Sequence, residues 1–116
     1  MASGLAFVEY VCDQINAPEN ISFKKMFGDY AIYFERKVVA LVCDNQLFVK
    51  QTKAGRELLK TVVEAPPYPG AKPYFLIGDI IEDRALMRNL FHVTQSELPE
   101  PKPKKQRKNY NKSAQV

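Results

Sequence analysis

Apolar residues recur along the first part of the chain with two different periods. Between residues 5 and 15 they stand three and four positions apart, which predicts an amphipathic helix that Ser3 can cap. The segment 17–20 contains Pro and Asn and ends this helix. Short apolar runs separated by tight polar turns then favour an antiparallel meander. The predicted strands span residues 21–27, 30–34, 38–43 and 46–50.

The second half of the chain predicts two more helices and one more strand. Thr52 can cap a helix over residues 53–63, and the Pro-rich segment that follows ends it. The four prolines of residues 66–73 predict a stiff and extended loop. A strand over residues 74–77 and a helix over residues 83–98 complete the pattern.

This order of elements predicts an α+β domain with two layers. We expect a mostly antiparallel sheet of about five strands, with about three helices against one face. The strand over residues 38–43 is apolar at every position, which favours a strand covered on both faces or one at the centre of the sheet. The pair Gly28-Asp29 interrupts an aromatic stretch and predicts a bulge or bend between the first two strands.

The positive charge of the chain is concentrated near its C-terminal end. Residues 99–116 hold six basic residues and one acidic residue, whereas residues 1–98 hold 11 Lys and Arg against 12 Asp and Glu. The terminal segment alternates Pro and Lys and has few apolar residues, which predicts disorder. The chain is therefore predicted to have one domain over residues 1–98 and a disordered basic tail over residues 99–116.

The tail is the candidate contact for nucleic acid. Mobile cations can bind phosphates without reading sequence, and Tyr110 offers a ring that can stack on a base. The alternative is a solubilising tail that has no specific partner. The candidate phosphate contacts are Lys102, Lys104, Lys105, Arg107, Lys108 and Lys112.

The sequence does not predict a catalytic, metal or cofactor site. His92 is the single histidine, and Cys12 and Cys43 lack the close spacing of a redox or zinc motif. Structural thiols are therefore expected, with a reactive thiol as the alternative. An acidic cluster near the last helix favours capping over a divalent metal site. It consists of Asp79, Glu82 and Asp83.

The Pro-rich loop is the candidate contact for a protein partner. Tyr68 and Lys72 stand on a stiff segment, which loses little conformational entropy when it binds. The alternative is a well-packed connection that covers a sheet edge. The sequence leaves open whether the chain is a monomer or a homodimer. It has no apolar run long enough for a membrane helix and no signal peptide, so a cytoplasmic location is expected.

Three blocks, "KKMFGDYAIYF", "VVALVCDNQLFVKQT" and "PPYPGAKPYFLI", resemble the N-terminal domain of the TfoX/Sxy family of competence regulators. The family pattern has a basic residue, Met-Phe-Gly-Gly, an aromatic residue, Gly, an aliphatic residue and Tyr. Asp29 and Ala31 replace the second and third of these glycines, and the resemblance covers about residues 5–95. Longer members carry a second domain, and activities that depend on that domain are not expected for this chain.

The resemblance implies a regulatory role related to competence or transcription, and it does not imply an enzyme. The first hypothesis is a small regulatory or adaptor protein that acts through protein contacts. The alternative is an accessory protein that binds nucleic acid through its basic tail. A third and less supported hypothesis is a ligand-binding module with a pocket near Gly28 and Tyr68.

Overall fold

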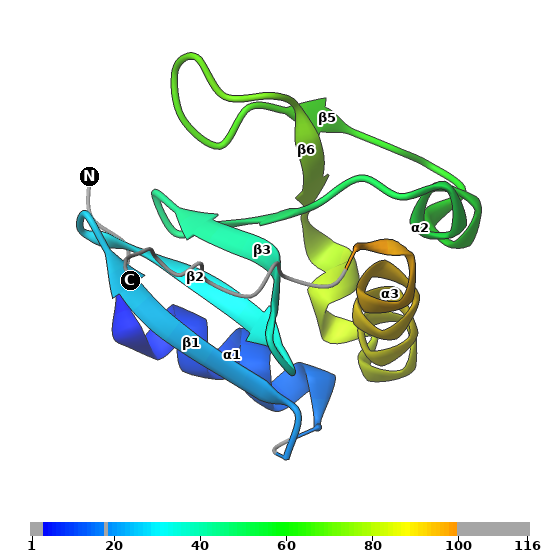
Figure 1. The fold of residues 1–116 in the computed structure, drawn as a ribbon, viewed down its shortest axis with the longest axis horizontal. Coiled ribbons are helices and arrows are strands. Elements are labelled where there is room, and N and C mark those ends of the chain that lie inside the picture. Colours follow the sequence, from blue (N-terminus) through cyan, green and yellow to red (C-terminus); the bar gives the residue numbers. More distant parts are fainter. Residues whose placement is uncertain (1–3, 18, 100–116) are drawn as a thin grey trace, which may run out of the picture.

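The computed structural model describes residues 4–17 and 19–99, which form three α-helices, one 3-10 helix and six strands (Figure 1). In chain order these are α1 (Leu5–Ile15), β1 (Ile21–Met26), β2 (Asp29–Phe34), β3 (Lys37–Cys43), β4 (Gln46–Val49), α2 (Lys53–Leu59), β5 (Glu64–Ala65), β6 (Tyr74–Ile77), η1 (Asp79–Glu82) and α3 (Arg84–Glu97). None of the helices in these residues has the length and apolar content that crossing a membrane requires.

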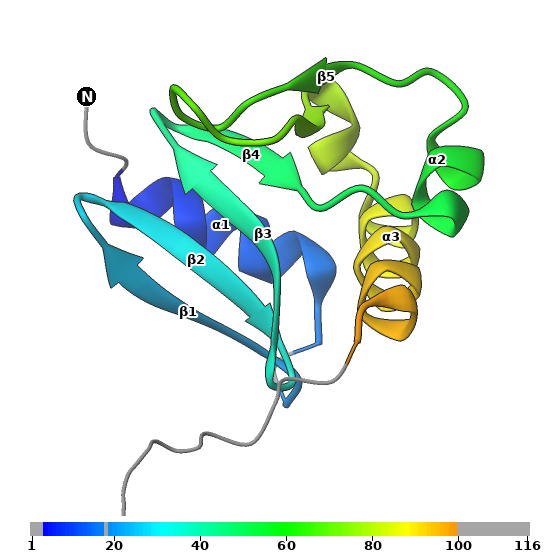
Figure 2. The ribbon, with the colours of Figure 1, turned by 45° about the horizontal axis from the view of Figure 1, so that its top comes forward.

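All six strands form one antiparallel sheet in the order β1-β2-β3-β4-β6-β5. Helix α1 crosses behind β2 and β3, and α3 packs against both α1 and α2 (Figure 2). The predicted α+β class, with helices against one face of the sheet, is confirmed. The predicted number of strands is too low by one, because the two-residue strand β5 at the sheet edge was not foreseen.

Two layers of apolar side chains lie on opposite faces of the sheet. The larger cluster fills the space between the sheet and the helices, and Phe75 and Phe91 are its largest fully buried side chains. The smaller cluster lies on the other face, which we call the outer face. It consists of Ala31, Leu41, Cys43 and Phe48, with partly buried neighbours around them. Strand β3 contributes to both clusters and lies inside the sheet between β2 and β4, which confirms the prediction of a strand covered on both faces or at the centre of the sheet.

Of the two predicted alternatives at Gly28-Asp29, a bulge or a bend between the first two strands, the structure shows a bend, which lies one residue earlier, at Phe27-Gly28. Asp29 is the first residue of β2 and pairs with Met26, so the chain turns through only two residues, Phe27 and Gly28. Both have positive φ, 53° and 84°, which is the pattern of a type I′ hairpin turn. A shift in register occurs between β2 and β3. Ile32 pairs with Ala40 and Tyr33 pairs with Val38, so β3 contains one extra residue at this point.

The helix boundaries differ from the predicted ones for local reasons. Helix α1 follows Gly4 as its N-cap, and the predicted cap Ser3 lies outside the described residues. Helix α2 ends at Leu59 and not at residue 63, since Lys60 has a positive φ of 65° that no α-helix accepts. At the start of α3, the Asp83 side chain accepts a hydrogen bond of 3.1 Å from the Leu86 N–H, which confirms capping by this residue.

The C-terminal end of α3 is held by a buried lysine. The Nζ of Lys37 donates hydrogen bonds of 2.8 Å to the carbonyl oxygens of Gln95 and Leu98, and the residue is only 8% exposed. A cation at the end of a helix is favourable because the last carbonyl groups carry partial negative charge. Lys37 therefore fixes α3 to the start of β3.

Candidate functional site

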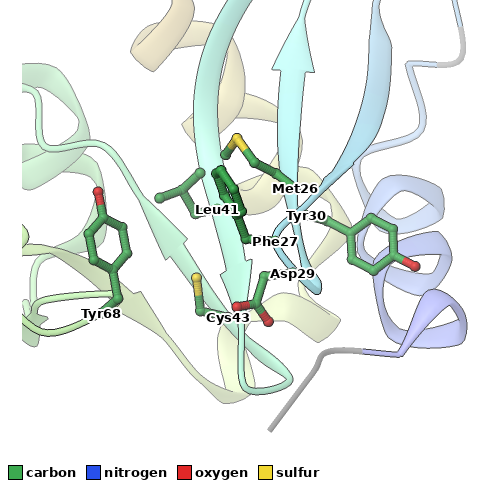
Figure 3. A pocket seen from close by; sticks show the side chains of 7 residues that line it. All are labelled: Met26, Phe27, Asp29, Tyr30, Leu41, Cys43 and Tyr68. Carbon is green, nitrogen blue, oxygen red and sulfur yellow. The ribbon is translucent and has the colours of Figure 1, made fainter.

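The outer face of the sheet carries a mostly apolar groove of about 530 Å³ beside the β1–β2 turn (Figure 3). It lies near Gly28 and Tyr68, where the third hypothesis placed a pocket. Residues from β1, β2, β3, the β1–β2 turn and the loop 66–73 line it. They are Met26, Phe27, Asp29, Tyr30, Leu41, Cys43 and Tyr68.

Phe27 occupies an unusual position for a phenylalanine. It is the first residue of the two-residue turn, has a φ of 53° and is 100% exposed. The β3–β4 turn has the same pattern of two positive φ values, 54° and 55°, but fills it with Asp44 and Asn45. Those residue types tolerate the left-handed region, whereas a bulky aromatic residue is strained there. The fold thus holds a large apolar side chain in solvent on a strained backbone.

Two further exposed apolar side chains border the groove. Met26 is 43% exposed at the end of β1, and Tyr68 is 56% exposed on the Pro-rich loop. Figure 3 shows Tyr68 on one side and Met26 with Phe27 on the other, with Leu41 and Cys43 between them. Tyr30 points away from these residues, toward α1, and packs edge-on against Phe23 with ring centroids 5.7 Å apart.

The polar groups near the groove are few and mostly uncharged. Asp29 accepts a hydrogen bond of 3.3 Å at Oδ1 from the Asp44 N–H, which ties the β1–β2 turn to the β3–β4 turn. Burial, followed by the nearby Asp29 charge, raises the pKa of the Cys43 thiol. Burial also raises the pKa of Tyr74, with smaller effects from Tyr68 and Cys43. The groove therefore presents apolar surface and a protonated thiol, which is a poor nucleophile.

The structure brings one of the two predicted partner contacts to the groove. Tyr68 lines it, whereas Lys72 is exposed on the same loop and is not among the lining residues. The exposure of Phe27 and Met26 was not predicted from the sequence. Phe27-Gly28 is not one of the dipeptides that are typical of a two-residue hairpin turn, and the turn is defined only by the register in which Met26 pairs with Asp29.

The six basic residues proposed to contact nucleic acid lie outside the described residues, so their role stays a prediction. They are Lys102, Lys104, Lys105, Arg107, Lys108 and Lys112.

The other candidate reactive groups lie in packed surroundings. The ring of His92 packs edge-on against Phe34, with centroids 5.9 Å apart, while Cys43 lies on the opposite face of the sheet. Burial, aided by the Glu9 charge, raises the pKa of Cys12 to about 11. Within residues 4–17 and 19–99, no three His, Cys, Asp or Glu side chains gather in a way that could hold a metal ion. These features favour structural thiols over reactive ones.

Comparison with known proteins agrees with the resemblance seen in the sequence. The family model described as the TfoX N-terminal domain matches residues 13–97. The chain is also similar to an uncharacterised 12.7 kDa protein encoded in the region 5′ of trpE in Spirochaeta aurantia. The two are 39% identical over 105 residues, which cover 90% of this chain and 91% of that protein. The range matched by the family model, residues 13–97, spans the positions that line the groove.

Proposed function

This chain belongs to the TfoX N-terminal domain family, a family related to competence regulation, and from that premise we propose a small non-enzymatic regulatory or adaptor protein that acts through protein contacts. The observation that carries the proposal is the fully exposed Phe27 beside an apolar groove. We assign the protein contact to this surface, called the contact surface below. It consists of Met26, Phe27 and Tyr68 with the groove between them.

The energetics of Phe27 favour a role in binding over a role in folding. Its ring is fully exposed and contributes no burial to the core, while its positive φ costs on the order of 1 kcal/mol for a bulky residue. A residue that strains the isolated fold without stabilising it is explained if the ring is buried in a complex. Aromatic side chains, Phe among them, are enriched at protein interfaces relative to the rest of the protein surface.

The groove is also rigid enough to bind at a low entropic cost. One rim is a two-residue turn held by strand pairing and by the hydrogen bond between Asp44 and Asp29. The opposite rim, Tyr68, lies between Pro67 and Pro69, whose φ angles are fixed. Side chains that are already positioned lose little freedom when a partner binds.

The test is capture of partners from the native host with purified tagged protein. Phe27→Asn removes the ring and supplies an Asn-Gly turn, which a type I′ hairpin prefers. Val63→Asn is the matched control, since Val63 is 53% exposed and is not among the residues that line the groove. We expect wild type and Val63→Asn to recover the same proteins, and Phe27→Asn to lose them. Equal recovery by all three, or recovery of no protein by wild type, would contradict the proposal.

The second candidate function is binding of nucleic acid through the basic segment. What favours it is the distribution of charge, because residues 99–116 have six basic residues and one acidic residue, whereas residues 1–98 have one more acidic than basic residue. Binding of duplex and single strands should weaken steeply with salt and disappear when residues 99–116 are removed. Affinity that survives the truncation would show that the segment is not responsible.

A further inference from the structure

We infer that the partner of the contact surface is a second copy of this chain, with Phe27 of each copy inserted into the groove of the other about a twofold axis. This inference rests on the proposed function, since it assigns a partner to the same surface.

The projecting side chain and the hollow that can receive it lie on one patch. Phe27 is fully exposed at the tip of the β1–β2 turn and also lines the groove of about 530 Å³, which is large enough for a phenyl ring. The floor of the groove is Leu41 and Cys43, and its opposite rim is Tyr68. An incoming aromatic ring would therefore meet apolar and aromatic groups, which favour offset or edge-to-face contact.

Symmetry explains why a second copy is a suitable occupant. In an isologous contact, one patch meets the same patch on the partner, so a single twofold axis satisfies both projecting rings and both grooves. A head-to-tail contact would leave one Phe27 in solvent and one groove open at the ends of the assembly. Twofold pairing leaves neither exposed.

The charge of the domain permits two copies to approach. Residues 1–98 have 11 basic and 12 acidic residues, so the domains carry little net charge. Both signs also stand along the chain near the turn. Lys24 and Lys25 precede it in β1, and Asp29 follows it in β2. Lys72 on the loop of Tyr68 adds a further cation, and Asp44, whose N–H donates to Asp29, adds a further acid, so charges of both signs surround the patch.

The area available predicts a weak and reversible dimer. A buried aromatic side chain removes about 150–250 Å² from solvent, and each copy offers Phe27 together with the exposed parts of Tyr68 and Met26. Over two copies the buried area is below about 1,200 Å², which is the range of weak and transient interfaces. We therefore expect an association that is reversible and depends on the protein concentration.

Sedimentation velocity over about 5–500 μM full-length protein tests the inference. The expected result is a weight-average mass that rises toward that of the dimer for wild type and for Val63→Asn. Phe27→Asn should remain at the mass of the monomer. A wild-type chain that is monomeric at every concentration overturns the inference, and so does a dimer that forms equally well with Phe27→Asn.

A photocrosslinking experiment tests the arrangement of the dimer. Benzoylphenylalanine at position 27 keeps an aromatic ring at the tip, and mixing with isotopically labelled wild type separates contacts between copies from contacts within one copy. We expect crosslinks from the modified copy to the labelled peptides that contain Leu41, Cys43 or Tyr68. Crosslinks between copies that fall only on α1 or α3 would overturn the arrangement.

The two proposals can fail separately. If the chain stays monomeric while capture of another protein still requires Phe27, the second copy is the wrong partner and the proposed function stands. If Phe27→Asn changes neither the mass nor the capture, both proposals fall.

Discussion

Replacement of Phe27 by Asn should stabilise the isolated domain, which is an unusual expectation for the loss of a large apolar residue. Phe27 is the first residue of a turn whose two central φ values are 53° and 84°. Asn enters the left-handed region more readily than Phe does, and Asn-Gly is the preferred sequence for this turn. The variant thus removes backbone strain and keeps Gly28.

The magnitude follows from exposure and strain. Since the ring of Phe27 is 100% exposed, its removal should create no cavity and cost no buried apolar area. The strain of a bulky residue at positive φ is on the order of 1 kcal/mol, and Asn relieves part of it. We therefore expect a gain of about 0.5–1 kcal/mol in the free energy of unfolding. For a domain of this size the melting temperature should rise by about 2–6 °C.

Urea unfolding followed by circular dichroism measures this gain, and circular dichroism suits the protein because it contains no Trp. The midpoint should rise while the m-value stays constant, because the surface exposed on unfolding hardly changes. Gly28→Val is the opposing control, since a β-branched residue at a φ of 84° should lower the midpoint. A loss of more than about 0.5 kcal/mol for Phe27→Asn would refute the reasoning, because it would show that the ring stabilises the fold.

Three further outcomes follow from the packing of the domain. Gly55→Ala should lower the free energy of unfolding by about 1–2 kcal/mol, because the new Cβ would stand 2.7 Å from the Thr52 Oγ1 that caps α2. An unchanged midpoint in urea unfolding would contradict this expectation. Lys37→Met should lower the free energy of unfolding by about 1–3 kcal/mol, since it removes the donor to two carbonyl groups at the end of α3. A variant as stable as wild type would show that the two hydrogen bonds do not contribute to stability. Cys12 has its pKa raised from 9.0 to about 11, so the folded state retains a proton that the unfolded state loses. Stability should therefore fall as pH rises from about 9 to 11, with a smaller fall in Cys12→Ala, and equal slopes in both proteins would contradict this.

The meander was predictable because its strands are short apolar runs separated by tight polar turns. Strands β2 to β4 are mostly buried along their length, and such runs between turns are typical of consecutive antiparallel strands. The paired strand β6 was located at its observed bounds for the same reason. By contrast, β5 consists of Glu64 and Ala65, which have no strand pattern and are placed by pairing with β6.

The contact surface was harder to predict because it depends on exceptions to local rules. The sequence predicts one strand over the apolar run of residues 21–27, which places Phe27 at the end of that strand. The observed register moves it into the turn and leaves it in solvent. Tyr68 was identified from the stiffness of its loop, but only the fold shows that it lies across the groove from Met26. Tertiary pairing, and not residue type, decided which aromatic side chains are exposed.

The most direct test measures stability and partner binding on the same pair of proteins, wild type and Phe27→Asn. We expect the two properties to move in opposite directions, with a higher urea midpoint and a loss of both partner capture and concentration-dependent mass in the variant. A variant that keeps its binding, or one that loses stability together with binding, would contradict a contact role for Phe27.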